Sequence, residues 1–218
     1  MYYDFGQLFL IMQCIPGDRS DRLWPFLTDA EKTSISEQLR RIFNRLRQAE
    51  CPEHQFFGGL DAGPVHHYLF YSQKGDPQHL GPFRDEAAFV KGLTDNYRAL
   101  MELNGHPLFK VRFYESHLGQ VLQNHRPVLT HGDLYMKNII VAEKRGNSSN
   151  GGERSFDIAL VDWEMAGWLP EFWEYFCASM SFNYMGWDDD WCWRTRHFLP
   201  VYFAETAVMR ELDRDMGF

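Results

Sequence analysis

Three short apolar runs around one polar loop constrain the fold of this chain more than any other feature. Residues 126–130 lead as a strand into a polar loop, and residues 139–141 leave that loop as a second strand. A connection rich in Gly and Asn follows, and a third strand over residues 158–161 then ends at Asp162. This order predicts short hairpins that carry a functional loop and bring Asp162 beside it.

The rest of the chain is mainly typical of helices. The clearest signal is the capping box of Thr28 with Glu31, followed by apolar residues at helical spacing, which predicts a helix over Asp29 to Gln48. The other expected elements are a buried strand at Phe9–Cys14, irregular backbone or a hairpin at Pro52–Pro64, and helices at Asp85–Leu103, Lys110–Gln123, Pro170–Met180 and Pro200–Leu212. We therefore expect an α+β fold with a mainly helical body.

Composition excludes several classes of partner. The net charge is −8 and Lys/Arg residues do not alternate with aromatic ones, so we expect no nucleic-acid partner. The N-terminal apolar run, residues 8–12, is too short to span a bilayer and follows no basic segment, so we expect no membrane segment. Cys14, Cys51, Cys177 and Cys192 form no CxxC pair, which predicts free thiols and a reducing, cytoplasmic location.

The candidate catalytic and metal-binding residues lie in the segment HGDLYMKN, residues 131–138, and at Asp162. Phosphoryl transfer requires a carboxylate that orients and deprotonates the acceptor hydroxyl, and oxygen ligands for magnesium on the phosphates. Asp133 suits the first task, and Asn138 and Asp162 suit the second. His131 is expected to hold the loop by hydrogen bonds rather than to react.

In these residues the chain resembles the aminoglycoside phosphotransferase and choline kinase superfamily, in particular its fungal members. The matching segments are HGDLYMKN, LVDWEMAGW, the hinge-like FLIMQCIPG, GLDAGP, GPFRDEAAF and PEFWEY. The resemblance implies a protein-kinase-like fold, with residues 1–17 as a hinge-strand remnant of the N-terminal lobe and residues 18–218 as the C-terminal lobe. It also implies an ATP- and Mg²⁺-dependent enzyme that phosphorylates a small hydroxyl compound.

The same resemblance assigns the site residues. Asp133 is the expected catalytic base, and Asn138 and Asp162 are the expected magnesium ligands. The backbone around Gln13 and Ile15 is expected to hold the adenine, and Lys137 is assigned to the nucleotide. Family acceptors are often cationic, and Glu171, Glu174 and Asp188 to Asp190 would suit such an acceptor, although solvated surface explains such charges more often.

The chain departs from the family pattern at its N-terminal end. It contains no GxGxxG, and its six lysines all follow the hinge-like segment, so the phosphate-covering loop, the strand lysine and its glutamate partner have no counterpart. Three explanations stay open: a truncated kinase, a pseudokinase-like binding module, or an enzyme that uses the same cleft for other chemistry.

Two further expectations follow from these observations. A metal-dependent hydrolase is the second enzyme class that an HxD and a later Asp allow, but it leaves the position of Asn138 unexplained. The hinge-like strand would expose an edge and apolar side chains, which predicts self-association through that edge.

Overall fold

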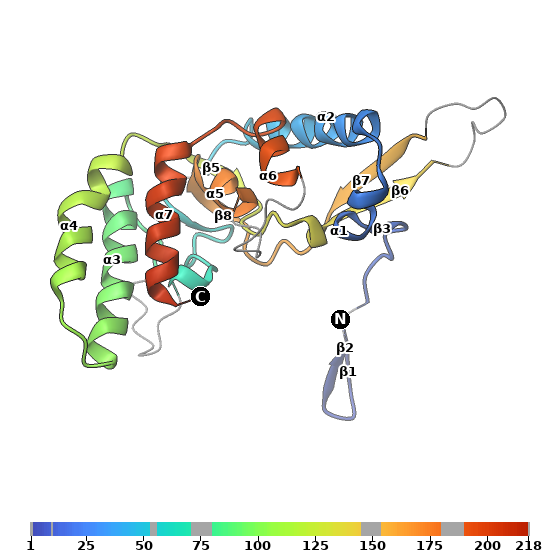
Figure 1. Cartoon of the computed structure of the whole chain (residues 1–218). Helices are drawn as coiled ribbons and strands as arrows, with labels where there is room; N and C mark the ends of the chain where they lie inside the picture. The colour runs from blue at the N-terminus through green and yellow to red at the C-terminus, as the bar shows by residue number, and fades with distance from the viewer. Residues whose placement is uncertain are drawn as a thin grey trace.

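The computed structural model describes residues 2–9, 11–52, 56–70, 80–144, 154–179 and 190–217. Within these ranges the chain forms small antiparallel sheets and several helices. Helices α3 (Glu86–Leu103), α4 (Phe109–Val121) and α7 (Phe203–Met216) lie side by side at one end, and the hairpin of β6 (Ile139–Glu143) and β7 (Phe156–Leu160) lies at the other (Figure 1). The α+β class expected from the sequence is confirmed.

The polar loop connects two different sheets, and the sheet that it leads into has the order β3-β6-β7. Strands β6 (Ile139–Glu143) and β7 (Phe156–Leu160) form the expected antiparallel hairpin, with Ile139 opposite Leu160. Strand β3 (Asp18–Arg19) pairs with the other edge of β6. The segment that follows Gly17 is therefore built into the same sheet as the loop.

A second sheet has the order β4-β8-β5. Its strands are β4 (Gly58–Gly59), β8 (Gly167–Pro170) and β5 (Pro127–Thr130). The predicted helix start at Pro170 is wrong, because Pro170 is the last residue of β8 and lies opposite Pro127. Proline is tolerated at this strand end since neither residue has an N–H to donate, and helix α5 (Trp173–Ser179) begins three residues later.

The expected long helices are confirmed, with ends that differ by a few residues. Helix α2 (Asp29–Leu46) has the predicted capping box, with the Glu31 N–H donating to Thr28 Oγ1 and the Thr28 N–H donating to the Glu31 carboxylate. The other helices are α1 (Ser20–Leu23), α3 (Glu86–Leu103), α4 (Phe109–Val121), α6 (Trp191–Arg194) and α7 (Phe203–Met216), with 3-10 turns at Trp24–Phe26, Tyr68–Phe70, Met136–Asn138 and Thr195–His197.

Two apolar clusters meet at α5. One packs α3, α4 and α7 around aromatic residues and includes Phe176 and Cys177 of α5. The other packs α2 and the β6–β7 hairpin and includes Ala178 of α5 together with Leu134 and Met136 of the polar loop. Because α5 contributes residues to both clusters, it is packed into the core beside the polar loop.

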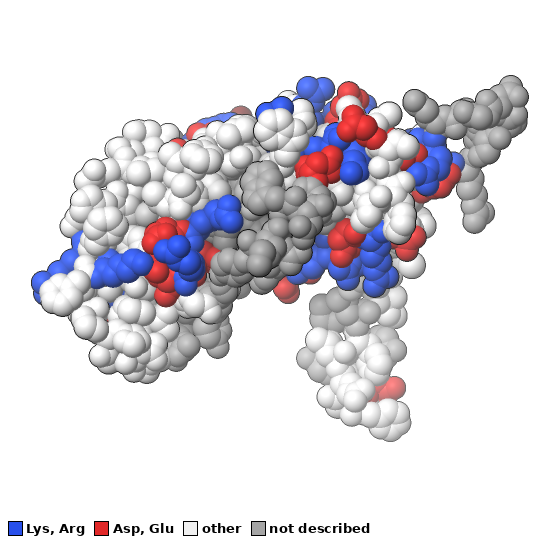
Figure 2. Space-filling model, in the orientation of Figure 1, with Lys and Arg blue, Asp and Glu red and all other residues white. Residues whose placement is uncertain are grey.

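The N-terminal residues form an arm that projects from the rest of the chain (Figures 1 and 2). Strand β1 (Tyr2–Asp4) pairs with β2 (Gln7–Phe9), and residues 11–16 have no regular secondary structure. The predicted buried strand at Phe9–Cys14 is therefore wrong for its described residues, which exclude Leu10: residues 11–14 form no strand, and Ile11 and Met12 are 75% and 71% exposed. An apolar run indicates a strand but not its partner, and among the described residues β2 pairs with β1 alone.

The surface carries mixed charges. On the face in Figure 2, Lys and Arg side chains lie among Asp and Glu side chains in small groups rather than in one basic area. None of the helices in the described part of the chain combines the length and apolar character needed to cross a bilayer. The four cysteines are free, as expected from their spacing.

Candidate active site

The polar loop, residues 131–138, begins where strand β5 ends. It ends in the 3-10 turn Met136–Asn138, and strand β6 follows directly. Within the loop the Asn138 side-chain N–H₂ donates to the Asp133 carbonyl at 2.9 Å and to Asp133 Oδ2 at 2.7 Å. Both side chains are buried. The five-residue spacing therefore brings a carboxylate and a carboxamide into direct contact.

His131 ties this loop to the end of β7. Its Nδ1 accepts from the Asp133 backbone N–H at 3.3 Å, and its Nε2 lies 3.0 Å from the Val161 carbonyl. These partners select the neutral tautomer with the proton on Nε2. Burial lowers the pKa of His131, while the Val161 carbonyl and the carboxylates of Asp133 and Asp162 act in the opposite direction. A neutral, fully bonded imidazole is suited to holding the loop.

Asp162 follows β7 and adopts a left-handed backbone conformation with φ of 67°. Its side chain is exposed, and it lies close enough to His131 to act on that ring electrostatically, as Asp133 does. The next residue, Trp163, packs its ring 4.6 Å from the His131 ring. The two acidic residues expected from the sequence thus both lie near His131.

At Gly132 the polar loop of residues 131–138 contacts the segment after β7 that contains Met165. Its φ is 80°, and a Cβ at this position would lie 2.3 Å from the Met165 carbonyl oxygen. Only glycine combines this backbone conformation with such a close approach.

Lys137 lies at the exposed edge of the site. Its Nζ is 3.6 Å from Asp133 Oδ2 and lies over the Tyr135 ring at 5.3 Å. The cation is thus close to the carboxylate yet accessible to an anionic ligand.

Glu174 contacts the polar loop of residues 131–138 from α5. The sequence did not predict this position. The expectation that it belongs to an acidic surface is wrong: Glu174 is buried, and its Oε2 accepts from the His131 backbone N–H at 2.6 Å. Burial raises the pKa of Glu174 to about 7, while the backbone N–H groups of His131 and Gly132 and the charge of Arg47 act to lower it. The sequence did contain one indication that Glu174 is buried, because its neighbours on the same helix, Trp173 and Phe176, are apolar.

The other acidic residues considered for a cationic acceptor have partners or lie elsewhere. Asp190 accepts from Lys32 at 2.9 Å and from Arg194 and Trp24, and Glu171 pairs with Arg126 at 3.5 Å. Asp188 and Asp189 lie outside the described residues. The described part of this acidic set therefore forms no free acidic surface.

The segment expected to hold adenine is exposed. Gln13 and Ile15 lie in the stretch 11–16 without regular structure, immediately before β3. Just after β3, Ser20 Oγ donates to the Met136 carbonyl at 2.8 Å. The hinge-like segment thus enters the fold next to the loop, and the adenine role of its backbone stays a prediction.

The donor set suits magnesium. Asp162 supplies a carboxylate, and Asn138 supplies a carboxamide oxygen, because its nitrogen is turned toward Asp133. Magnesium binds hard oxygen ligands and uses one or two carboxylates together with phosphate oxygens. Among the described residues no three His, Cys, Asp or Glu side chains gather as a metal cage.

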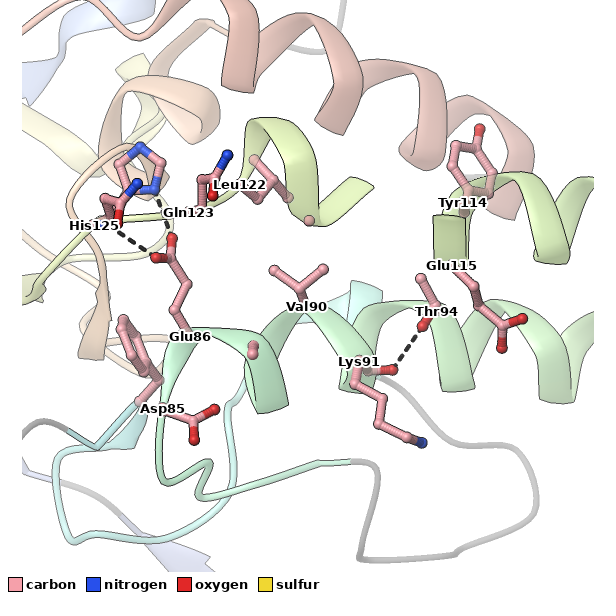
Figure 3. A pocket seen from close by; sticks show the side chains of 14 residues that line it. Asp85, Glu86, Val90, Lys91, Thr94, Tyr114, Glu115, Leu122, Gln123 and His125 are labelled. Carbon is pink, nitrogen blue, oxygen red and sulfur yellow. Dashed lines mark hydrogen bonds and ion pairs between the residues drawn. The ribbon is translucent and has the colours of Figure 1, made fainter. Parts of the chain in front are cut away.

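A separate cavity of about 780 Å³ lies between α3 and α4 (Figure 3). Its lining includes Glu86, Lys91, Glu115 and His125 but no residue of the 131–138 loop. Those four charged or titratable side chains already have partners: Glu86 pairs with His125, Lys91 with Asp95, and Glu115 with Arg98. The cavity is therefore distinct from the candidate active site.

Comparison with known proteins agrees with this geometry. No curated protein and no solved structure matched the chain. A family model described as the phosphotransferase enzyme family (APH) matches residues 3–213, which include the arm, the polar loop, Asp162 and α7. The resemblance noted in the sequence is thereby confirmed, and the family implies a kinase-like fold. The chain belongs to the phosphotransferase enzyme family.

Proposed function

We propose that this chain is an ATP- and Mg²⁺-dependent phosphotransferase that transfers the terminal phosphoryl group to a hydroxyl of a small molecule. The observation that carries the proposal is the contact between Asp133 and Asn138. Asp133 and Asp162 also both lie near His131. A carboxylate for the hydroxyl and oxygen donors for the metal are the parts that phosphoryl transfer requires.

Asp133 is the proposed base. It orients the acceptor hydroxyl and takes its proton as the oxygen attacks the terminal phosphorus. The Asn138 N–H₂ group holds Oδ2 of that carboxylate at 2.7 Å, which restricts the side chain to one orientation. Because His131 is neutral and bonded on both ring nitrogens, it does not compete for this proton.

Magnesium, held by Asn138 and Asp162, would supply charge neutralisation on the phosphate oxygens. Asp162 reaches solvent, so it can accept such a ligand without rearrangement of the core. Lys137 is half exposed beside Asp133 and would contribute a cation to the phosphates. The exposed backbone at Gln13 and Ile15 would receive the adenine.

A non-catalytic binding module is the second candidate. It is favoured by the exposed apolar side chains of the N-terminal arm, where Phe5 is 99% and Ile11 75% exposed. Such a module would bind a nucleotide or a partner without transferring phosphate.

An assay of phosphoryl transfer distinguishes the phosphotransferase from the non-catalytic binding module. The purified chain is incubated with ATP, Mg²⁺ and a panel of small alcohols, amino alcohols and sugars, and phosphate esters are followed by ³¹P NMR. A new ester signal that is lost in Asp133→Asn supports the phosphotransferase. An ester that forms equally in Asp133→Asn would exclude Asp133 as the base, and MgATP binding without any ester across the panel would favour the binding module.

A further inference from the structure

The cavity between α3 and α4 lies between two facing helix surfaces (Figure 3). Ala87, Val90 and Thr94 recur at three- and four-residue spacing and therefore line one face of α3. Glu115 and Gly119 are four residues apart and line the facing side of α4. At a rise of about 1.5 Å per residue, the α3 face alone spans roughly 10 Å. The cavity of about 780 Å³ is thus long enough for a two-ring molecule, and its volume is typical of small-molecule sites.

Gly119 leaves this cavity open, although folding does not require a glycine at its position. Nothing lies within 4 Å of a Cβ added to Gly119, and its backbone is not in the left-handed region. A glycine in the middle of a helix is destabilising relative to alanine. A larger side chain at this position would instead fill the space between α4 and α3. Gly119 therefore reduces the stability of α4 while it preserves room for a ligand.

The acidic and basic side chains at the cavity already have partners. Four pairs hold them: Asp85 with Arg84 at 3.2 Å, Glu86 with His125 at 2.5 Å, Lys91 with Asp95 at 2.5 Å and Glu115 with Arg98 at 2.5 Å. A charged ligand would have to displace one of these partners. Between the pairs the lining is apolar, and Phe57, Val90 and Leu122 are buried there. This lining suits a neutral ligand with an apolar body.

The C-terminal end of α4 supplies hydrogen-bond acceptors beside the cavity. The Gln123 side-chain N–H₂ donates to the Gln120 carbonyl at 2.7 Å, which leaves the carboxamide oxygen of Gln123 as an acceptor. The last four carbonyls of a helix also have no partner within the helix. Because α4 ends at Val121, the Gly119 carbonyl belongs to this last turn. A ligand that donates one hydrogen bond therefore finds an acceptor here.

We propose that the cavity between α3 and α4 is a second binding site, which takes a neutral molecule with an apolar body and one hydrogen-bond donor. The cavity lining contains no residue of the 131–138 loop, so this inference does not depend on the proposed phosphotransferase function. The bound molecule contacts residues 122–125, which lead through Arg126 into β5.

Indole is the probe for this site, because it is a neutral two-ring molecule with a single N–H donor. Its binding is followed in ¹H–¹⁵N NMR spectra of the full chain, in which we expect saturable shifts of the Gly119 and Gln123 amide signals. Gly119→Leu fills the cavity. Ser116→Leu is the control, because Ser116 is exposed on the same helix and does not line the cavity.

The two leucine variants separate loss of the cavity from a general effect of a new apolar side chain on α4. We expect Gly119→Leu to weaken indole binding by at least about 10-fold and Ser116→Leu to change it by less than about 2-fold. Asp162→Ala is expected to bind indole as the wild type does, because Asp162 does not line the cavity. A wild type without saturable shifts at Gly119 and Gln123, or equal indole affinity in wild type and Gly119→Leu, would overturn the proposal.

Matched probes test the ligand class without any substitution in the protein. 1-Methylindole lacks the donor, tryptamine carries a positive charge, and indole-3-acetate carries a negative charge. Because a neutral hydrogen bond contributes modestly to binding, we expect 1-methylindole to bind about 3- to 10-fold more weakly than indole. We expect neither charged analogue to bind more tightly than indole. Equal affinity for 1-methylindole and indole, or tighter binding of either charged analogue, would overturn the assigned ligand class.

Discussion

Asn138 donates from one side-chain nitrogen to both the carbonyl and the carboxylate of Asp133, at 2.9 and 2.7 Å. The residue proposed to bind metal therefore also fixes the residue proposed as base. This single contact links the two tasks of the site, and changes at Asn138 should affect stability and activity together.

Replacement of Asn138 by Ala removes both hydrogen bonds and leaves the Asp133 carboxylate buried without that donor. Because hydrogen bonds to charged groups contribute roughly 1.5 to 3 kcal/mol, we expect the free energy of unfolding to fall by about 2 kcal/mol. Urea denaturation measures this loss. A matched control is Asn104→Ala, because Asn104 is exposed and its side chain donates only to the Leu100 carbonyl. Equal losses in the two variants would contradict the special role of the contact.

Gly132→Ala tests the close approach of the two loops. The new Cβ would lie 2.3 Å from the Met165 carbonyl oxygen at a φ of 80°. Gly105→Ala is a control with the same kind of backbone, since Gly105 has φ of 67° and nothing within 4 Å of an added Cβ. We expect a loss of about 1 kcal/mol for Gly105→Ala and of at least about 3 kcal/mol for Gly132→Ala. Similar unfolding free energies for the two variants would refute the clash.

Glu174 should make stability depend on pH near neutrality. Its pKa is raised from an ordinary value of 4.5 to about 7 in the folded chain, chiefly by burial. The folded state therefore binds the proton more tightly, and the stabilisation is present below pH 4.5 and is lost as pH rises through about 7. The full change in the free energy of unfolding that this pKa shift produces is roughly 3 kcal/mol.

The comparison that isolates this effect is wild type against Glu174→Gln, with chemical denaturation at several pH values between 5 and 8. We expect the wild type to lose more stability than the variant as pH rises. Parallel curves would show that Glu174 does not titrate in this range.

The arm offers a test of self-association. Leu8 is 51% exposed on β2, and Leu103 is 49% exposed at the end of α3. Unpaired strand edges with apolar side chains favour association with another chain. We expect the purified chain to sediment as a concentration-dependent oligomer, Leu8→Lys to shift it toward monomer, and Leu103→Lys to leave it unchanged. A wild type that stays monomeric at micromolar concentration would rule out this association.

Features encoded by nearby residues could be predicted from the sequence. The capping box of Thr28 and Glu31 determines where α2 begins, because both partners lie within one turn. The contact of Asp133 with Asn138 likewise arises within a loop of eight residues. The third strand, which precedes Asp162, followed from its apolar pattern, and its pairing with β6 agreed with the expected hairpin.

Features that depend on distant partners could not be predicted in this way. Pro170 suits the first turn of a helix as well as a strand end, and only the pairing with Pro127 decides between them. Glu174 looked like a surface acid because its partner, the His131 N–H, is 43 residues away. The arm looked like a buried strand because apolar side chains do not by themselves specify what covers them.

Calorimetric titration of the ligand-free chain with ATP, with and without Mg²⁺, tests the central claim most directly, because binding does not require a known acceptor. We predict binding that depends on Mg²⁺ and is lost in Asp162→Ala, while Asp157→Ala, an exposed carboxylate on β7 paired with Lys144, binds as the wild type does. Binding that is absent, or that is unaffected by Mg²⁺ and by Asp162→Ala, would contradict the assignment of this loop as a phosphotransferase site.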